Sequence, residues 1–94
     1  MNLEIQNEEN ESKGAYFYKR GTERVAEMTY SIAGTDRIII DHTEVSDAYR
    51  GGELGQKLVR KAVDDARRKG ISIVPLCPFA RSVFNKNEEL RDVL

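Results

Sequence analysis

The chain has one cysteine and one histidine, and both stand where they could take part in chemistry. Cys77 directly precedes Pro78, the expected first residue of a helix, and the helix dipole favours a thiolate there. His42 is the side chain best suited to accept the thiol proton near neutral pH. The two could therefore form a nucleophile and its base. The simpler interpretations are that Cys77 is a small buried filler and that His42 is structural.

A second candidate is the stretch YRGGELGQKL, residues 49–58. Glycines between a strand and a helix let backbone N–H groups face an anion at the helix N-terminus, where the dipole favours phosphate. Arg50 adds a charged donor at the start of the loop. The spacing is neither that of a P-loop nor that of the dinucleotide fingerprint. The alternative is that Gly51 and Gly52 only make a tight turn.

The segments before this loop have the pattern of strands. We expect a short edge strand at 3–5, strands at 15–19, 24–32 and 37–45, and a hairpin turn at 33–36. Residues 24–32 alternate apolar and polar side chains, which is typical of a half-buried strand. The consecutive isoleucines 38–40 predict a central strand covered on both faces. The acidic stretch 7–14 is expected to be a solvated turn.

After the loop the period changes to that of a helix. Leu54, Leu58, Ala62 and Ala66 recur every fourth residue, and a basic last turn is followed by Gly70. A short strand at 71–76 and a second helix at 78–90 follow. A strand–helix–strand unit of this length requires a parallel, right-handed crossover. The expected fold is mixed α/β in a single domain, residues 1–94: an antiparallel meander, one βαβ unit and a C-terminal helix.

This order of elements, together with the loop, resembles the GCN5-related N-acetyltransferase superfamily over roughly residues 23–90. That family's acetyl-CoA loop reads Arg/Gln-x-x-Gly-x-Gly/Ala after a central strand. Arg50 matches its first position and Gly55 its last, whereas Glu53 stands where the middle glycine is usual. The brevity of the chain, HTEV before the loop and LCPF after the last strand resemble the very small YjdJ-type branch.

The resemblance implies a minimal version of that fold, with acetyl-CoA as acetyl donor and an amine of unknown identity as acceptor. Counting from Ala80, Cys77 stands where the family has an asparagine that contacts the cofactor arm. Phe84 stands where it has the tyrosine that protonates the leaving thiolate. The implied cofactor contacts are the strand end and the loop with the first helical turn: Val45, Arg50, Gly51, Gly52, Glu53, Leu54, Gly55 and Gln56.

Two routes of acetyl transfer are compatible with these residues. In the first, His42 deprotonates Cys77, the thiolate takes the acetyl group, and an amine attacks the acetyl-cysteine. In the second, the amine attacks acetyl-CoA directly, with His42 or Glu44 as base. Pro75 cannot donate a ladder hydrogen bond, so we expect the last two strands to separate there and form a slot between Cys77 and His42. A module that binds acetyl-CoA or CoA without turnover is the main alternative.

The composition disfavours several other classes of protein. Fifteen basic against sixteen acidic residues disfavour a nucleic-acid protein, although a basic helix face at 57–68 keeps that third possibility open. One histidine and one cysteine are too few for a typical zinc site. No signal peptide or membrane span is evident, and the single cysteine suggests a reducing, cytoplasmic compartment.

Overall fold

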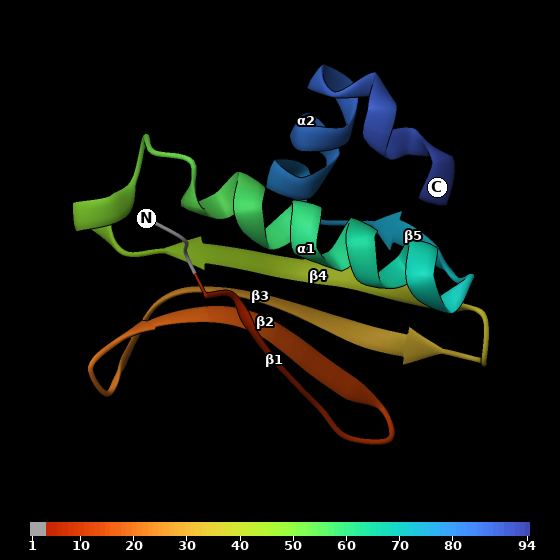
Figure 1. The fold of residues 1–94 in the computed structure, drawn as a ribbon, viewed down its shortest axis with the longest axis horizontal. Coiled ribbons are helices and arrows are strands. Elements are labelled where there is room, and N and C mark those ends of the chain that lie inside the picture. The colour runs from red at the N-terminus through yellow and green to blue at the C-terminus, as the bar shows by residue number, and fades with distance from the viewer. Residues whose placement is uncertain (1–3) are drawn as a thin grey trace.

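The computed structural model describes residues 4–94 and contains one five-stranded sheet in the order β1-β2-β3-β4-β5 (Figure 1). The strands are β1 Gln6–Glu9, β2 Lys13–Arg20, β3 Glu23–Ala33, β4 Arg37–Val45 and β5 Ser72–Pro75. The first four pair antiparallel, and β5 pairs parallel with β4. The helices are η1 Asp47–Tyr49, α1 Leu54–Lys69, α2 Pro78–Lys86 and η2 Glu88–Val93. The predicted mixed α/β class is therefore confirmed.

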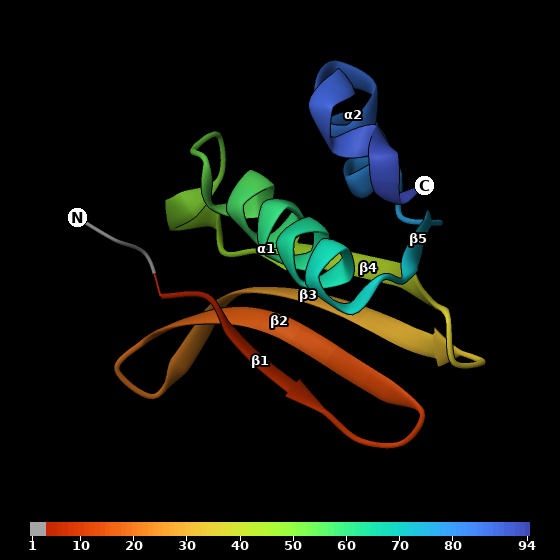
Figure 2. The same cartoon turned by 45° about the vertical axis from the view of Figure 1, so that its right-hand side comes forward.

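The helices gather on one face of the sheet, with α1 lying along it and α2 beside α1 (Figures 1 and 2). The helix α1 buries the face predicted from its four-residue spacing. Leu58 and Val59 are wholly buried in the same core cluster as Met28 and Ile40 of the sheet. Gly70 ends α1 in the left-handed conformation, at φ 69°, and its N–H bonds back to the last turn. We call the face that α1 covers the inner face.

The first strand differs from the expectation. The anticipated strand at 3–5 includes Leu3, which lies outside the described residues, and the acidic stretch expected to be a turn instead contributes β1. Long-range contacts hold these polar residues in the sheet. Glu8 pairs with Arg24 on β3, and Glu9 accepts a hydrogen bond from the Tyr30 hydroxyl at 2.7 Å.

The strand β4 also departs from the expected pattern. Tyr30 on β3 pairs with Ile40, but Thr29 pairs with His42, so Asp41 is an extra residue and forms a β-bulge. One extra residue exchanges the faces of all side chains beyond it. Ile39 is only half-buried, because no helix of residues 4–94 covers the outer face. The expectation that both faces are covered was wrong.

Candidate active site

A cavity of about 530 Å³ lies where β4 continues beyond the end of β5. This volume is within the usual range for sites that bind small molecules. The walls come from the end of β4, the glycine loop, and the first turns of α1 and α2: His42, Thr43, Glu44, Val45, Tyr49, Arg50, Gly51, Gly52, Gly55 and Phe79.

The cavity opens because β4 and β5 separate, as the position of Pro75 predicted. Their pairing ends at Ile40 and Pro75, which has no N–H to continue it. The Ile40 carbonyl then accepts both the Leu76 amide at 3.1 Å and the Cys77 amide at 3.2 Å. The rest of β4 therefore has an edge that β5 does not pair with.

The polar backbone groups of this edge face the cavity. The Ser46 amide bonds to the Val25 carbonyl of β3 at 2.7 Å, so the alternation of an antiparallel ladder directs the groups of Val45 and Thr43 the other way. The Val45 carbonyl accepts from Nε of Arg50 at 3.3 Å, which agrees with that direction. A chain with its own amides could pair with this edge.

The glycine loop presents free backbone donors. The first amide bonded within α1 is that of Lys57, which donates to Glu53 at 2.9 Å. Within residues 4–94, no acceptor is found for the amides of 51–56. Gly51 has φ 81°, a backbone conformation that L residues rarely adopt. These amides lie at the positive end of the α1 dipole, so the site suits an anion such as a phosphate.

The remaining residues expected at the loop have different surroundings. Glu53 is exposed, and its side chain caps no amide, which leaves its carboxylate in solvent. Leu54 is buried in the core and offers only its backbone. Gln56 is exposed and does not border the cavity. Arg50 pairs with Asp47 at 3.2 Å, and the Arg50 side chain is 72% exposed at the mouth.

His42 and Glu44 form a pair on the outer face of β4. His42 Nε2 lies 3.1 Å from Glu44 Oε1, and both residues border the cavity. The bulge at Asp41 produces this arrangement, because it turns His42 away from the inner face that Ile40 occupies. An imidazole paired with a carboxylate therefore lies beside the slot.

Cys77 has a different partner from the one expected. The thiol is 4% exposed, and its Sγ donates to Oγ1 of Thr43 at 3.4 Å. In the part of the chain that the structure describes, no hydrogen bond joins Cys77 to His42. Thr43 was not a candidate in the sequence analysis. It takes the inner-face position that alternation without a bulge would have given to His42. Cys77 does not border the cavity, whereas Thr43 does.

The two phenylalanines of α2 have different surroundings. Phe84 is 1% exposed and belongs to the core, so no hydroxyl is available at the position where the resemblance implies a tyrosine. Phe79 is 39% exposed and borders the cavity. Neither Phe79 nor Tyr49 was among the candidate residues predicted from the sequence. Aromatic residues flanking the glycine loop and opening α2 were the available signal.

The basic face of α1 is largely neutralised by carboxylates. Lys61 and Arg68 both pair with the buried Asp65, at 3.3 and 2.9 Å. Arg67 pairs with Asp92 at 2.6 Å, and Arg60 lies 3.4 Å from Glu89. A polyanion would have to compete with these contacts, which disfavours the nucleic-acid alternative.

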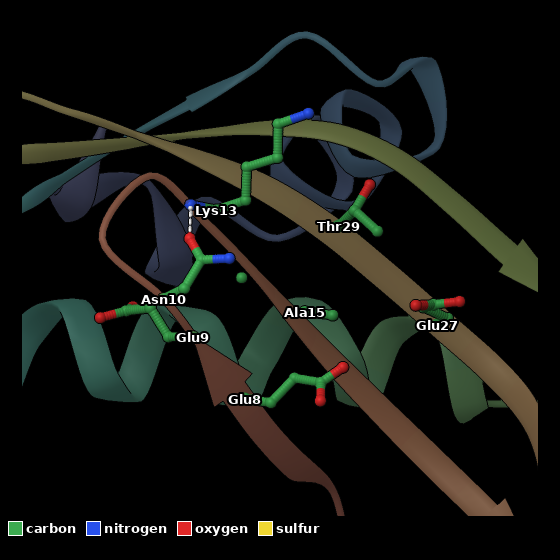
Figure 3. A pocket seen from close by; sticks show the side chains of 8 residues that line it. Glu8, Glu9, Asn10, Lys13, Ala15, Glu27 and Thr29 are labelled. Atoms are coloured by element: carbon green, nitrogen blue, oxygen red, sulfur yellow. Dashed lines mark hydrogen bonds between the residues drawn. The ribbon is translucent and has the colours of Figure 1, made fainter.

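A separate hollow of about 420 Å³ lies over the β1–β2 turn and the neighbouring strands (Figure 3). Glu8, Glu27 and Thr29 line it, and the Lys13 amide donates to Oδ1 of Asn10 at 2.9 Å. It shares no lining residue with the cavity at the glycine loop. Within residues 4–94 no group of three metal-binding side chains is found, and no helix is long and apolar enough to cross a membrane.

The structure is similar to several solved acetyltransferases. A GCN5-like protein from Staphylococcus aureus, solved by NMR, is 34% identical with a TM-score of 0.71, and the match covers 98% of this chain and 87% of that one. The ribosomal-protein-alanine N-acetyltransferase of Brucella melitensis has a TM-score of 0.67 at 17% identity, over 82% and 62% of the two chains. A GNAT family acetyltransferase from Elizabethkingia anophelis, with acetyl-CoA bound, has a TM-score of 0.59 at 17% identity. The match covers 68% of this chain and 42% of that one.

The chain thus spans less than two thirds of the last two enzymes. No curated protein sequence matches it closely enough to count as a relative. The family model described as GCN5-related N-acetyl-transferase matches residues 15–93. The chain therefore belongs to the GCN5-related N-acetyltransferase family.

Proposed function

We propose that this protein is an acetyl-CoA-dependent N-acetyltransferase that acts on an amine bound beside the end of β4. The observation that carries the proposal is the cavity where the unsatisfied loop amides meet the unpaired edge of β4. The amides of 51–56 would bind the pyrophosphate of acetyl-CoA, and the backbone of Thr43 and Val45 would pair with the amides of the pantetheine arm. The acetyl-CoA bound to the Elizabethkingia anophelis structure supports this ligand class.

The direct route fits the side chains at the cavity better than the thiol route. The acceptor nitrogen would attack the thioester carbonyl carbon, so that a C–N bond forms, the C–S bond breaks, and CoA leaves as the thiolate. His42 would take the amine proton. If His42 Nε2 carries the hydrogen shared with Glu44, Nδ1 is the free basic nitrogen. Cys77 is buried and does not border the cavity, so its thiol would have to become accessible before it could meet a thioester.

Both routes can be separated with purified protein, acetyl-CoA and a panel of amines, following acetylated product by mass spectrometry. We expect His42→Ala and Glu44→Gln to lower kcat by roughly 100-fold, the usual scale of a general base. Asp41→Asn is the matched control, because this carboxylate on the same strand bonds to Ser31 and does not border the cavity. If Cys77→Ala alone abolishes turnover and an acetylated Cys77 peptide is trapped, the thiol route holds instead.

A module that binds acetyl-CoA without turnover is the second candidate. The observation that favours it is Phe84, which is buried in the core and supplies no proton for the leaving thiolate. Acetyl-CoA binding without product from any amine of the panel would support this module and contradict the enzyme.

A further inference from the structure

Phe79 is a large aromatic side chain that is partly exposed and is not part of the buried core. Of the large hydrophobic residues exposed in the described part of the chain, Leu76, Phe79 and Leu94, only Phe79 borders the cavity. It is the second residue of α2 and stands opposite the first turn of α1. An apolar ring facing a cavity of ligand size is well placed to be covered when a ligand binds.

Gly55 is the residue against which this ring lies. A Cβ at Gly55 would be 2.6 Å from Cζ and 2.9 Å from Cε2 of Phe79, closer than real side chains approach. Gly55 is helical and does not have a positive φ, so its backbone conformation is open to any residue. Glycine has a lower helix propensity than alanine, so the helix itself gives no reason for glycine here. The close approach of the Phe79 ring therefore accounts for glycine at this position.

The ring closes one wall of a cavity that has two kinds of lining. The amides of Gly51 and Gly52 and the edge of β4 are polar, whereas Val45, Tyr49 and Phe79 are apolar. A ligand that fits both linings has an anionic end and a thin chain that combines methylene groups with amides. Such a chain could pair its amides with β4 while its methylene groups pack on the ring.

We propose that Phe79 is a binding residue that packs against the pantetheine arm of the acyl donor. The absence of a side chain at Gly55 lets the Phe79 ring lie in this position. This inference rests on the proposed function, since it takes an acyl-pantetheine thioester as the ligand. The adenine ring of the same donor is the other group that could stack on an aromatic ring. The test therefore uses one donor with adenosine and one without it.

The experiment is an NMR titration of the full chain with acetyl-CoA and, in parallel, with acetyl-phosphopantetheine, which lacks the adenosine part. We expect Phe79→Ala to lower the affinity for both donors by roughly tenfold, because the variant lacks the apolar contact that the exposed part of the ring makes with the donor. Phe79→Leu, which keeps an apolar side chain in case the alanine variant does not fold, should lose roughly threefold. Equal affinity of the unchanged protein and Phe79→Leu would overturn the proposal, as would a loss seen with acetyl-CoA alone.

A double-mutant cycle tests the role of Gly55. The new methyl group in Gly55→Ala displaces the Phe79 ring, so this substitution should weaken donor binding in the natural sequence. It should weaken donor binding much less in the Phe79→Ala background, where the methyl group has room. Equal losses in both backgrounds would show that residue 55 acts without the ring, against the proposal. If the unchanged protein binds neither donor, the proposed function fails and this inference fails with it. Binding by the unchanged protein with no effect at Phe79 refutes the inference alone.

Discussion

The buried carboxylate of Asp65 accepts three hydrogen bonds, so we expect it to stabilise the fold strongly. Asp65 is 5% exposed and accepts hydrogen bonds from the Tyr16 hydroxyl at 2.8 Å, from Arg68 at 2.9 Å and from Lys61 at 3.3 Å. Tyr16 is itself 2% exposed, beneath α1. Asp65→Ala therefore leaves a buried hydroxyl without its acceptor.

An unsatisfied buried hydroxyl costs about 1–3 kcal/mol. The cation partners Lys61 and Arg68 are 40% and 64% exposed, and such pairs contribute only about 0.5 kcal/mol each. We therefore expect Asp65→Ala to lower the free energy of unfolding by about 2–4 kcal/mol. The matched control is Asp64→Ala on the same helix, because Asp64 is 71% exposed and lies 3.9 Å from Arg67.

The same residue gives the loss a pH dependence. Burial raises the pKa of Asp65, but the hydrogen bonds from Tyr16, Lys61 and Arg68 outweigh it and hold the pKa below its ordinary value of 3.8. A lowered folded-state pKa means that stabilisation is complete above the unfolded-state pKa and is lost as the pH falls through the folded-state pKa. Urea unfolding from about pH 7 down to about pH 3 should show the natural and Asp65→Ala proteins converging in acid. Equal stability at neutral pH, or a difference that grows in acid, would refute the reasoning.

Three further substitutions test the fold and the loop. In Gly14→Ala the new Cβ would overlap the ring of the buried Tyr30, so we expect the free energy of unfolding in urea to fall by about 2 kcal/mol; no loss would mean that the ring moves aside. In Gly51→Ala, at φ 81°, strain of about 1–2 kcal/mol should appear in stability or in acetyl-CoA affinity, and its absence from both would show that the loop relaxes. Arg50→Gln should weaken acetyl-CoA binding and flatten its salt dependence in calorimetry, whereas an unchanged salt dependence would place the guanidinium outside the phosphate site.

The parts of the fold that follow local rules could be predicted from the sequence. The strand β4 Arg37–Val45 and the helix α1 Leu54–Lys69 begin and end where the hydrophobic pattern and Gly70 indicated. Pro75 marked the point where the last two strands separate, because the missing N–H is a property of the residue itself.

Features that depend on distant contacts could not be predicted. The strand β1 Gln6–Glu9 is polar in every residue. Its backbone pairs with β2, and its side chains reach partners on β3 that the local pattern does not reveal. The bulge at Asp41 adds one residue to β4 and exchanges the faces of His42 and Thr43. The sequence therefore indicated the glycine loop and the end of β4, but it placed Cys77 beside His42, whereas Cys77 bonds to Thr43 and does not border the cavity.

The central claim is that acetyl-CoA binds between the glycine loop and the free edge of β4. An amide-resolved NMR titration with acetyl-CoA tests it most directly, because each unsatisfied amide of 51–56 should report a phosphate placed beside it. We expect the largest shifts at 51–56 and at 43–45, and only small shifts at the hollow over the β1–β2 turn. No shifts at about millimolar ligand, or shifts centred on that hollow, would contradict it.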